Sequence, residues 1–515
     1  MLVKVNSSAV DGLSAMSVLI EINTVPGKEF FMVGLPDNAV RESRTRVESA
    51  LHSSGFHLRE SKTTVNFAPA DVRKEGSGYD LPLAVGLLAA SRLVPQEKLG
   101  SCVFTGELGL DGSVRPVKGA LAMAIKARSD GYECLFVPKE NVREAVVVNR
   151  LKVFGVSTLS EVVDHLNGQQ LLEPTISDTR KEFFAAQGHH TIDFADVKGQ
   201  ESVKRAIEVA AAGGHNLMLV GSPGCGKSMM AKRIPTILPP LTLAESLETT
   251  LIHSVAGKLD QNVSLITERP FRAPHHTISN VALVGGGTHP QPGEISLAHN
   301  GVLFCDELPE FSRPVLEVMR QPLEDRRITI SRAKYSVDYP CSFMFVASMN
   351  PCPCGYYGDP AHRCVCTPGQ IQRYLNRISG PLLDRIDIQC EIDAVPFSEI
   401  SQAQPGEKSE VIRERVVAAR KIQEERFKNH KGIHCNAQMT EKMLNEFAQP
   451  DQRGLDMLRT AMERMNLSAR AYSRILKVAR TIADLDASPN VLSHHIAEAV
   501  GYRSLDRGDW AERGA

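Results

Sequence analysis

Residues 221–228 read Gly221-Ser222-Pro223-Gly224-Cys225-Gly226-Lys227-Ser228, which matches the phosphate-binding pattern G-x-x-x-x-G-K-[ST] at every fixed position. An apolar, strand-like run over 216–220 precedes this loop, and a helix-like stretch begins at Met229. Glycines let main-chain N–H groups point at a phosphate, while Lys227 can reach the β- and γ-phosphates and Ser228 can ligate Mg²⁺. A chance glycine-rich turn is the alternative, but the strand–loop–helix context favours nucleotide binding.

The bulk composition limits the partners that the chain can have. Its 515 residues are 42% hydrophobic and 23% charged, which is ordinary for a soluble globular protein. Because the formal net charge is −1, a nucleic-acid partner would have to meet a local basic patch. The N-terminus lacks the order of a signal peptide, no apolar run is long enough to span a bilayer, and the 11 cysteines favour reduced thiols. We therefore expect a cytoplasmic protein with no membrane partner.

Composition and periodicity divide the chain into segments. We expect an N-terminal α+β domain over 1–168, a linker over 169–191, an α/β ATPase core with a parallel sheet over 192–397, a helical lid over 398–503 and a tail over 504–515. In the first domain, 30–34 and 63–67 are strand-like and 81–93 is helix-like. In the lid, amphipathic helices are expected over 411–427, 470–485 and 493–500.

A second apolar run, 301–305, ends in two carboxylates, Asp306 and Glu307. Asp306 is placed to hold the Mg²⁺ shell, as in other phosphate-loop enzymes, and Glu307 to polarise water for attack on the γ-phosphate. The alternative is that the two acids merely begin a surface helix. Their distance along the chain from the phosphate-binding loop favours the catalytic interpretation.

Further polar residues suit roles in a ring-forming ATPase. Asn350 ends a strand-like run at the edge where ligands gather in parallel sheets, so it can orient the attacking water or sense the γ-phosphate. In ring ATPases an arginine such as Arg385 reaches the nucleotide of the next subunit, and Arg377 is a second candidate. Arg470 opens a lid helix, with Arg474 on the same face. Singly each arginine suits a surface charge, but their order favours a joint catalytic role.

Four other segments are specific enough to indicate a family: Arg272-Ala273-Pro274-His275-His276, 301–307, Asn350-Pro351-Cys352-Pro353-Cys354-Gly355 and 376–381. Over essentially the whole chain, these motifs resemble AAA+ ATPases of the magnesium-chelatase branch, and more closely the bacterial ComM/YifB-type proteins. The resemblance implies a homo-hexameric ring that hydrolyses ATP with Mg²⁺. It further implies a helicase-like motor on single-stranded or branched DNA, which drives branch migration while transforming DNA is integrated.

Residues 65–125 resemble the proteolytic domain of Lon-type proteases, a ribosomal-S5-like fold, through the segments 76–84 and 105–112. Asp80 stands where Lon enzymes carry a serine, and the place of their lysine falls near Leu121. Ser77 and Lys118 are out of register with these places, and a Ser-Lys dyad needs both groups within hydrogen-bond reach. We therefore expect no proteolysis, and a role in ring assembly or DNA guidance.

Four cysteines gather just after Asn350, in the pattern Cys352-x-Cys354 followed by Cys364-x-Cys366. Four thiolates can close a tetrahedral zinc site, although this spacing is tighter than the usual C-x₂₋₄-C. Reduced thiols without metal, or less favoured disulfides, are the alternatives, and His362 is a substitute ligand. We expect structural zinc. Cys225 and Cys305 are interpreted as small core residues.

A candidate DNA contact lies in the alternating stretch 326–337, which predicts a β-hairpin with Arg332 and Lys334 at its tip. In related ring motors such a hairpin points into the central pore, where six basic tips would meet a phosphate backbone. A solvated edge hairpin is the alternative. The pair His275-His276 has no evident carboxylate partner nearby in the sequence, which disfavours a metal site there.

Rival functions are a chelatase-like motor that remodels a protein partner, an ATP-dependent protease or unfoldase, and an ATP-gated scaffold. The Lon-like block and the cysteine cluster favour the DNA motor over the chelatase. The missing Ser-Lys dyad disfavours the protease. The pair Asp306-Glu307 disfavours the scaffold, because retained hydrolysis residues indicate turnover.

Overall fold

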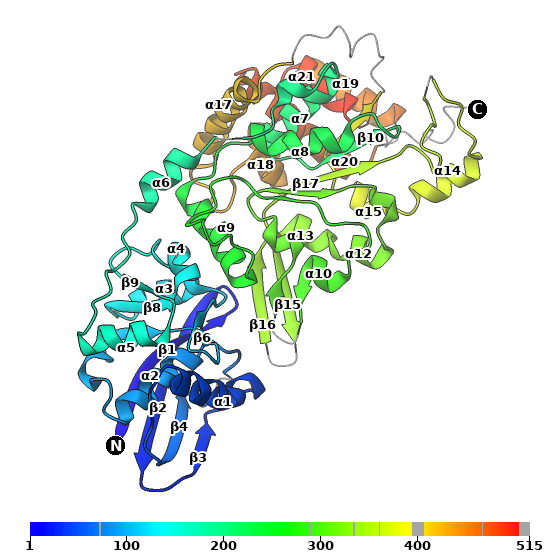
Figure 1. Cartoon of the computed structure of the whole chain (residues 1–515). Helices are drawn as coiled ribbons and strands as arrows, with labels where there is room; N and C mark the ends of the chain where they lie inside the picture. Colours follow the sequence, from blue (N-terminus) through cyan, green and yellow to red (C-terminus); the bar gives the residue numbers. More distant parts are fainter. Residues whose placement is uncertain are drawn as a thin grey trace. The chain divides into compact units, whose positions relative to one another are not determined.

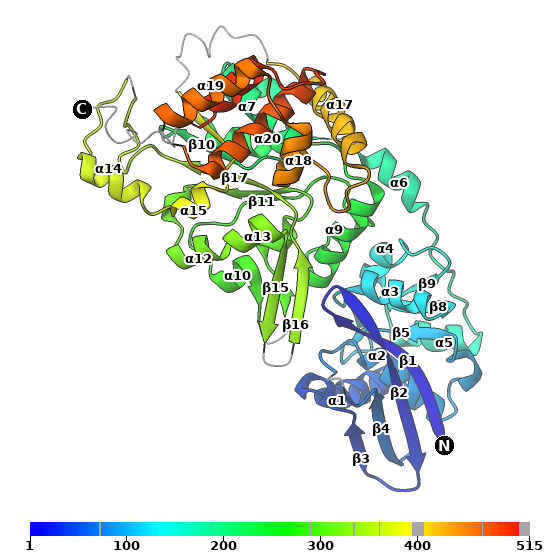
Figure 2. The same ribbon diagram turned by 180° about the vertical axis from the view of Figure 1, so that it is seen from behind.

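The computed structural model describes residues 1–71, 74–188, 190–287, 290–332, 335–359, 361–393, 406–465 and 467–503. The chain forms two compact units. Unit 1 comprises Met1–Ala186 and Thr242–Thr267, and unit 2 comprises Gln187–Leu241 and the chain from Glu268 onward. Figures 1 and 2 show the elements of both units from opposite sides. Within the described residues, no helix is both long and apolar enough to cross a membrane.

Unit 1 is built on a seven-stranded mixed sheet of order β3-β4-β2-β1-β5-β8-β9. Its strands are β1 (Leu2–Asp11), β2 (Ser14–Val25), β3 (Phe30–Val33), β4 (Lys62–Ala68), β5 (Cys102–Phe104), β8 (Cys134–Pro138) and β9 (Lys152–Val156). The strands β1 and β2 form a long antiparallel hairpin. The strands β5, β8 and β9 are parallel, and the helices α3 (Ala120–Ser129) and α4 (Val142–Ala145) connect them as crossovers. This sheet confirms the strands predicted at 30–34 and 63–67.

Helix α2 (Asp80–Ala90) forms the centre of unit 1, with every residue from Asp80 to Ala89 buried. A helix that is apolar on all sides has to lie inside the fold. The sequence predicted this helix over 81–93, but it ends at Ala90. The cause is Arg92, which adopts a left-handed φ of 61° and lets the Leu93 N–H donate back to Leu88 O at 2.9 Å.

A segment from the middle of the chain completes unit 1. Helix α9 (Leu243–Ala256) begins at a capping box between Thr242 and Glu245 and ends at Gly257, which has a left-handed φ of 66°. The helix packs on α3, where the Gly119 N–H donates to Ser254 O at 3.0 Å. The Ser254 hydroxyl donates to the carboxylate of Glu144. A stretch that follows the phosphate-binding loop in sequence therefore folds with the N-terminal residues.

The centre of unit 2 is a five-stranded parallel sheet of order β11-β14-β17-β10-β18. Its strands are β10 (Leu217–Gly221), β11 (Phe271–Arg272), β14 (Val302–Cys305), β17 (Met344–Met349) and β18 (Ile388–Ile392). Every residue of β10, β14 and β17 is buried, as expected for a parallel sheet covered on both faces. The helices α7 (Glu201–Gly213) and α8 (Lys227–Ile237) share its apolar core. The predicted α/β core is thus confirmed.

The C-terminal region is helical, as the sequence predicted, and its apolar residues join the core of unit 2. Its longer elements are α17 (Ser409–Phe427), α18 (Glu441–Phe447), α19 (Gln452–Arg464), α20 (Ala469–Leu485) and α21 (Ser493–Gly501). Three of them coincide with the helices predicted over 411–427, 470–485 and 493–500.

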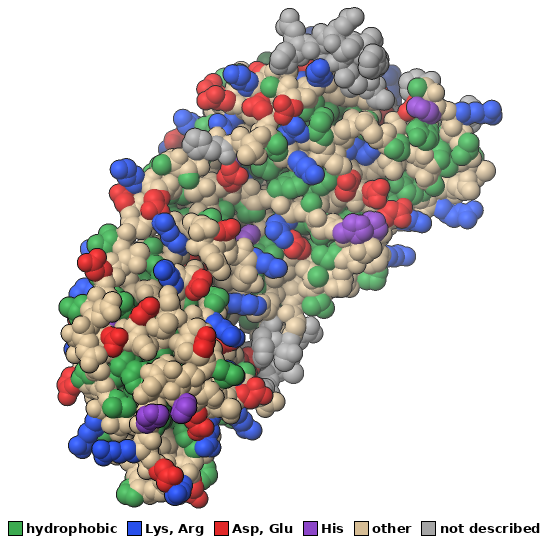
Figure 3. All heavy atoms as spheres, viewed as in Figure 1, with side chains coloured by type: hydrophobic (Ala, Val, Ile, Leu, Met, Phe, Trp, Pro, Cys, Tyr) green, Lys and Arg blue, Asp and Glu red, His purple; other side chains and the backbone are tan. Residues whose placement is uncertain are grey.

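The surface carries charges of both signs. Figure 3 shows lysine, arginine and acidic side chains interspersed over the visible face, without a broad field of one sign. This mixture agrees with the net charge of −1. A contact with a polyanion therefore has to come from a local group of basic residues.

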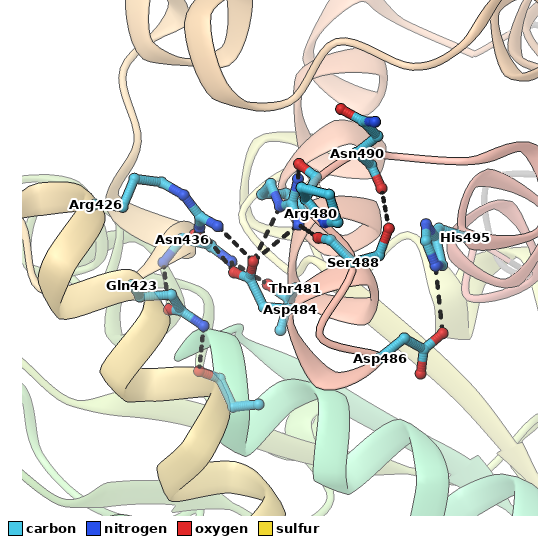
Figure 4. Close-up of polar contacts among 12 residues, drawn as sticks. Gln423, Arg426, Asn436, Arg480, Thr481, Asp484, Asp486, Ser488, Asn490 and His495 are labelled. Carbon is cyan, nitrogen blue, oxygen red and sulfur yellow. Dashed lines mark hydrogen bonds and ion pairs between the residues drawn. The ribbon is translucent and has the colours of Figure 1, made fainter.

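A buried carboxylate, Asp484, organises the helical lid (Figure 4). Its fully buried side chain accepts hydrogen bonds from Arg426 Nη1 at 2.8 Å, Asn436 Nδ2 at 2.7 Å and Arg480 Nε at 3.1 Å. Gln423 accepts from the Asn436 N–H at 3.0 Å and donates to the backbone of α7 at 3.1 Å. The network therefore joins α17, α20 and the turn at Asn436 to helix α7 in the core of unit 2.

Replacing Asp484 with Ala leaves the buried guanidinium of Arg480 and the mostly buried one of Arg426 without their counter-charge, so we expect the free energy of unfolding to fall by about 3–5 kcal/mol. Asp456→Ala removes an exposed carboxylate from α19, and this variant should change the free energy of unfolding by less than about 0.5 kcal/mol. Urea denaturation followed by circular dichroism compares the two variants. Equal unfolding midpoints would show that Asp484 does not organise the lid.

Candidate functional site

The phosphate-binding loop needs its glycines for steric reasons. Strand β10 ends at Gly221, where a Cβ would lie 2.4 Å from Ile392 O of β18. Gly224 and Gly226 have φ angles of 81° and 94°, which residues with a side chain rarely adopt. Helix α8 begins directly afterwards, at Lys227. The loop thus leads into a helix N-terminus, whose backbone N–H groups favour an anion.

Lys227 joins the loop to the end of a neighbouring strand. Its Nζ donates to Gly221 O at 2.7 Å, to Ser222 O at 3.0 Å and to Asn350 Oδ1 at 3.2 Å. Strands β10 and β17 are parallel neighbours, so their carboxyl ends meet at one edge of the sheet. The structure therefore brings together Lys227 and Asn350, both of which the sequence singled out.

The two predicted Mg²⁺ ligands are in direct contact. Ser228 Oγ donates to Asp306 Oδ2 at 2.7 Å. The second oxygen, Oδ1, accepts from the Ser348 hydroxyl and from the Glu307 N–H, the latter at 3.2 Å. A hydroxyl beside a carboxylate is an oxygen donor set that suits Mg²⁺. Sequence reasoning missed Ser348, although its place near the end of the strand before Asn350 was a usable signal.

Glu307 stands at a sharp change of chain direction. It has a left-handed φ of 52°, and its backbone N–H lies 3.3 Å from Ser348 Oγ. A left-handed residue other than glycine, asparagine or aspartate is uncommon and marks a site where surrounding contacts fix the backbone. The carboxylate is half exposed, with Oε2 3.8 Å from Nδ1 of His276. Solvent access and a fixed backbone suit a group that polarises water.

The candidate arginines are each bound to a carboxylate of the same chain. Arg385 donates to Glu324 and to the backbone of Pro381, and its side chain is only 14% exposed. Arg470, 70% exposed, lies 3.1 Å from Asp384. Arg377 Nη1 lies 2.9 Å from Oε1 of Glu310. None of these arginines contacts the phosphate-binding loop among the described residues.

A buried polar network that the sequence did not indicate connects the lid to the sheet. Asp387, at the start of β18, accepts from the Asn216 N–H at 3.1 Å, pairs with Arg474 of α20 and lies 3.5 Å from His215 Nδ1. Burial alone would raise the pKa of this carboxyl, but Arg474 and His215 hold it well below its usual range. The network lies at the amino ends of β10 and β18, at the opposite end of these strands from the phosphate-binding loop, and Arg470 lies one turn before Arg474 on α20.

The four clustered cysteines converge. Cys352 Sγ lies 3.3 Å from Cys354 Sγ and 3.7 Å from Cys364 Sγ, and the last two are 3.5 Å apart. All four sulfurs, including that of Cys366, lie within 4.8 Å of one another. A tetrahedral zinc site with Zn–S of about 2.3 Å has S–S edges of about 3.8 Å, so the arrangement fits zinc.

The cysteine segment packs on the phosphate-binding loop. A Cβ on Gly355 would lie 2.6 Å from Pro223 Cδ, so only glycine fits there. A cavity of about 110 Å³ is lined by 220–222, 357–359 and 391–393.

Cys225 and Cys305, which the sequence predicted as core residues, are buried. Burial raises the pKa of Cys305 to about 12 and also raises the pKa of Cys225.

The predicted hairpin is present as β15 (Arg327–Arg332) and β16 (Tyr335–Pro340), paired antiparallel from Arg327↔Pro340 to Arg332↔Tyr335. Lys334 lies outside the described residues, and for Arg332 the description covers the backbone but not the side chain. The tip contacts predicted for both therefore stay predictions.

Comparison with known proteins identifies the family. Family models described as magnesium chelatase subunit ChlI match residues 20–141 and 193–400, and a model of the ChlI C-terminal region matches 406–503. The chain is 43% identical over 505 residues to competence protein ComM of Haemophilus influenzae, covering 98% of this chain and 97% of that protein. The chain belongs to the ComM/YifB group of the magnesium-chelatase family.

Two further relatives support this assignment. The protein YifB of Escherichia coli is 43% identical over 508 residues, covering 98% of this chain and 97% of its own length. Lon protease 2 of Bacillus subtilis is 29% identical over 153 residues, 28% of this chain and 27% of that protein, which supports the Lon-like N-terminal region. Membership of this AAA+ family implies ATP and Mg²⁺ as the ligands of the site described above.

In this ComM/YifB-type chain, the residues at the Lon-type positions make structural contacts. Asp80 is fully buried and receives two hydrogen bonds from Arg46, at 2.8 and 3.0 Å. Leu121 is fully buried, and the Ser77 hydroxyl donates to Glu107. Ser77 and Lys118 do not bond to each other among the described residues. An acid in an ion pair does not supply the hydroxyl nucleophile of a Ser-Lys dyad, and the absence of proteolysis stays a prediction.

Ser348→Ala removes one hydrogen-bond donor from the carboxylate of Asp306. Since partners of metal ligands typically contribute about 10- to 100-fold to metal affinity, we expect the Mg²⁺ concentration for half-maximal ATP hydrolysis to rise at least about tenfold. Magnesium titrations of steady-state hydrolysis test this effect. Ser331→Ala, on the hairpin, is the control, and an unchanged magnesium requirement for Ser348→Ala would remove Ser348 from the site.

Proposed function

We propose that this chain is an ATP-hydrolysing DNA motor, which unwinds DNA or migrates its branches as a homo-hexamer during recombination or natural transformation. The observation that carries the proposal is the meeting of Lys227, Ser228, Asp306 and Asn350 at the carboxyl edge of one parallel sheet. Similarity along the whole chain to a competence protein supports a role in competence. Cytoplasmic location belongs to the same proposal.

The proposed reaction assigns a separate task to each group at this edge. Lys227 exchanges its contacts with the loop carbonyls for phosphate oxygens, while Ser228 and Asp306 hold Mg²⁺. Held by Ser228 and Asp306, Mg²⁺ would supply positive charge beside the phosphates. Glu307 orients the attacking water and takes up its proton, and Asn350 contacts the γ-phosphate.

The candidate arginines supply positive charge only after a rearrangement. Arg385 is bound to Glu324 within its own chain, and Arg470 to Asp384. A guanidinium that reaches a neighbouring nucleotide must first leave these carboxylates, because each ion pair holds the charged group beside its own chain. We propose that ring assembly releases Arg385 and that lid closure releases Arg470.

The DNA contact is proposed for the tip of the β15–β16 hairpin, at Arg332 and Lys334. Because the face shown in Figure 3 mixes both signs of charge and the net charge is −1, a local basic tip is the simplest way to meet a phosphate backbone. Repetition of the tip around a ring multiplies its charge. The Lon-like region is proposed to serve ring assembly or DNA guidance.

A second candidate is a chelatase-like motor that remodels a protein partner. The family models favour it, because all three describe magnesium-chelatase subunits. The near-neutral net charge is compatible with a protein partner as well. The two candidates differ in which ligand accelerates ATP hydrolysis.

Single-stranded or forked DNA is expected to raise steady-state ATP hydrolysis by at least about tenfold, which corresponds to lowering the activation barrier by about 1.4 kcal/mol. Lys227→Ala removes phosphate contacts and Glu307→Gln removes the base, so both should abolish hydrolysis with and without DNA. Strand displacement on a labelled fork is the companion measurement. Hydrolysis that DNA leaves unchanged would favour a protein partner instead.

Structural zinc at the four cysteines is part of the proposal, and metal analysis tests it. Freshly purified protein should contain one zinc ion per chain, and Cys364→Ser, which removes one of four thiolates, should contain less than about a tenth of that. Cys390→Ser, on β18, is a control that should retain the metal. Clearly substoichiometric zinc in the unaltered protein would rule out the site.

A further inference from the structure

Unit 1 contains an apolar groove that the reaction proposed above does not use. The groove is a hollow of about 780 Å³, lined by residues of α3, α9, the start of helix α6 (Thr179–Ala186) and nearby loops. Its volume lies within the usual range of ligand pockets. Every lining residue belongs to unit 1, so one compact part of the chain forms the whole groove. The apolar part of the lining consists of Ile125, Val147, Val148, Leu243, Leu247 and Leu265.

Three large apolar side chains of this groove are exposed to solvent. Ile125 of α3 is 38% exposed, and Leu243 and Leu247 of α9 are 41% and 36% exposed. The two leucines are four residues apart, so they lie on the same face of their helix. Single exposed apolar residues are ordinary on a protein surface, whereas several gathered in one hollow mark a binding site. The floor of the groove therefore suits a ligand with apolar groups.

The margin of the groove is basic. Arg128 and Arg180 line the groove, and Arg128 also lines an adjoining hollow of about 580 Å³ that contains Arg150 and Lys152. All four side chains are exposed, and within the described residues none of them forms an ion pair or donates a side-chain hydrogen bond. Cations that are not paired within the chain are available to the carboxylates of a ligand.

The other polar groups of the lining do not cancel this positive charge. Asp178 and Glu133 are the carboxylates among the lining residues, and Asp178 Oδ1 already accepts from the Lys181 N–H at 3.1 Å. The buried hydroxyl of Thr179, in the groove, has no hydrogen-bond partner among the described residues. A buried polar group of this kind calls for a partner, which the main chain of a bound peptide can supply. The lining thus combines an apolar floor, a cationic margin and one polar contact.

We propose that this groove binds a short acidic peptide of a partner protein, with large apolar side chains of the peptide on Leu243 and Leu247 and its carboxylates against Arg128 and Arg150. Peptides that dock in grooves gain affinity from apolar anchors, and charge complementarity adds selectivity. A nucleic-acid strand would match the cations but not the apolar floor, because its backbone is charged at every nucleotide. The site is a further function of unit 1, and it does not depend on DNA being the track of the motor.

The test measures binding of a fluorescein-labelled synthetic peptide to the full-length protein by fluorescence anisotropy. The peptide has three aspartates followed by two leucines and a phenylalanine, and we expect a Kd of about 100 µM or tighter. Leu247→Asp, which puts a carboxylate into the apolar floor, should weaken binding at least about tenfold. Arg128→Glu, which reverses one charge of the margin, should weaken it at least about fivefold. The matched controls, Leu110→Asp and Arg59→Glu, alter exposed residues of unit 1 outside both hollows and should leave the Kd unchanged.

The outcomes identify the occupant of the groove. A Kd weaker than about 1 mM, or equal losses in the groove and control variants, overturns the proposal. Equal binding of a peptide with lysines in place of the aspartates overturns it as well, because the cationic margin would then select nothing. If Leu247→Asp lowers the mass of the assembled protein in analytical ultracentrifugation but leaves peptide binding intact, the groove belongs to a second copy of the chain. If Arg128→Glu weakens binding of a single-stranded oligonucleotide but not of the peptide, the site takes nucleic acid instead.

Discussion

The nucleotide site depends on the hydrogen bond between Ser228 and Asp306, which joins helix α8 to the end of β14. Helix α8 follows β10, and β10 is not a neighbour of β14 because β17 lies between them. The order of the strands therefore does not by itself bring Ser228 to Asp306. Ser348, on β17, bridges the gap by binding the other oxygen of Asp306. Two strands and helix α8 thus converge on one carboxylate. A shift of any of them would move the proposed magnesium ligands apart, so the sheet register sets the geometry of the site.

The lid is fixed to this sheet through a second carboxylate, Asp387. It is buried at the start of β18 and bound to Arg474 of α20. Because a buried charge without a partner is costly, the helix cannot leave Asp387 without a compensating group. Arg470 lies one turn earlier and is mostly exposed beside Asp384. Arg474 therefore fixes α20 to the sheet, whereas the exposed pair of Arg470 with Asp384 contributes little to holding the helix.

The sequence predicted the parts that follow from local pattern. The phosphate-binding loop, the strand before Asp306 and the hairpin at 327–340 all have periodicity or glycine spacing that leaves few alternatives. Parallel strands bring their carboxyl ends together, so the meeting of Lys227 with Asn350 was predictable as well. The networks around Asp387 and Asp484 were not predictable from the sequence. Their members come from distant segments, and no local pattern distinguishes a buried carboxylate from an exposed one.

The same limit explains why sequence reasoning did not assign helix α9 to unit 1. Its capping box and closing glycine predict a helix but not its partner, and its neighbours in sequence belong to the ATPase core. What decides its place is a pair of contacts, from Gly119 and Glu144 to Ser254. Glu144 also accepts from Asn141 at 2.6 Å, so the helix completes the hydrogen bonding of a buried acid. Without α9, Glu144 would lose a donor and the apolar face of α3 would lose its cover. The N-terminal region therefore requires a segment that begins and ends in the ATPase core, and the two units cannot be separated at a single point in the chain.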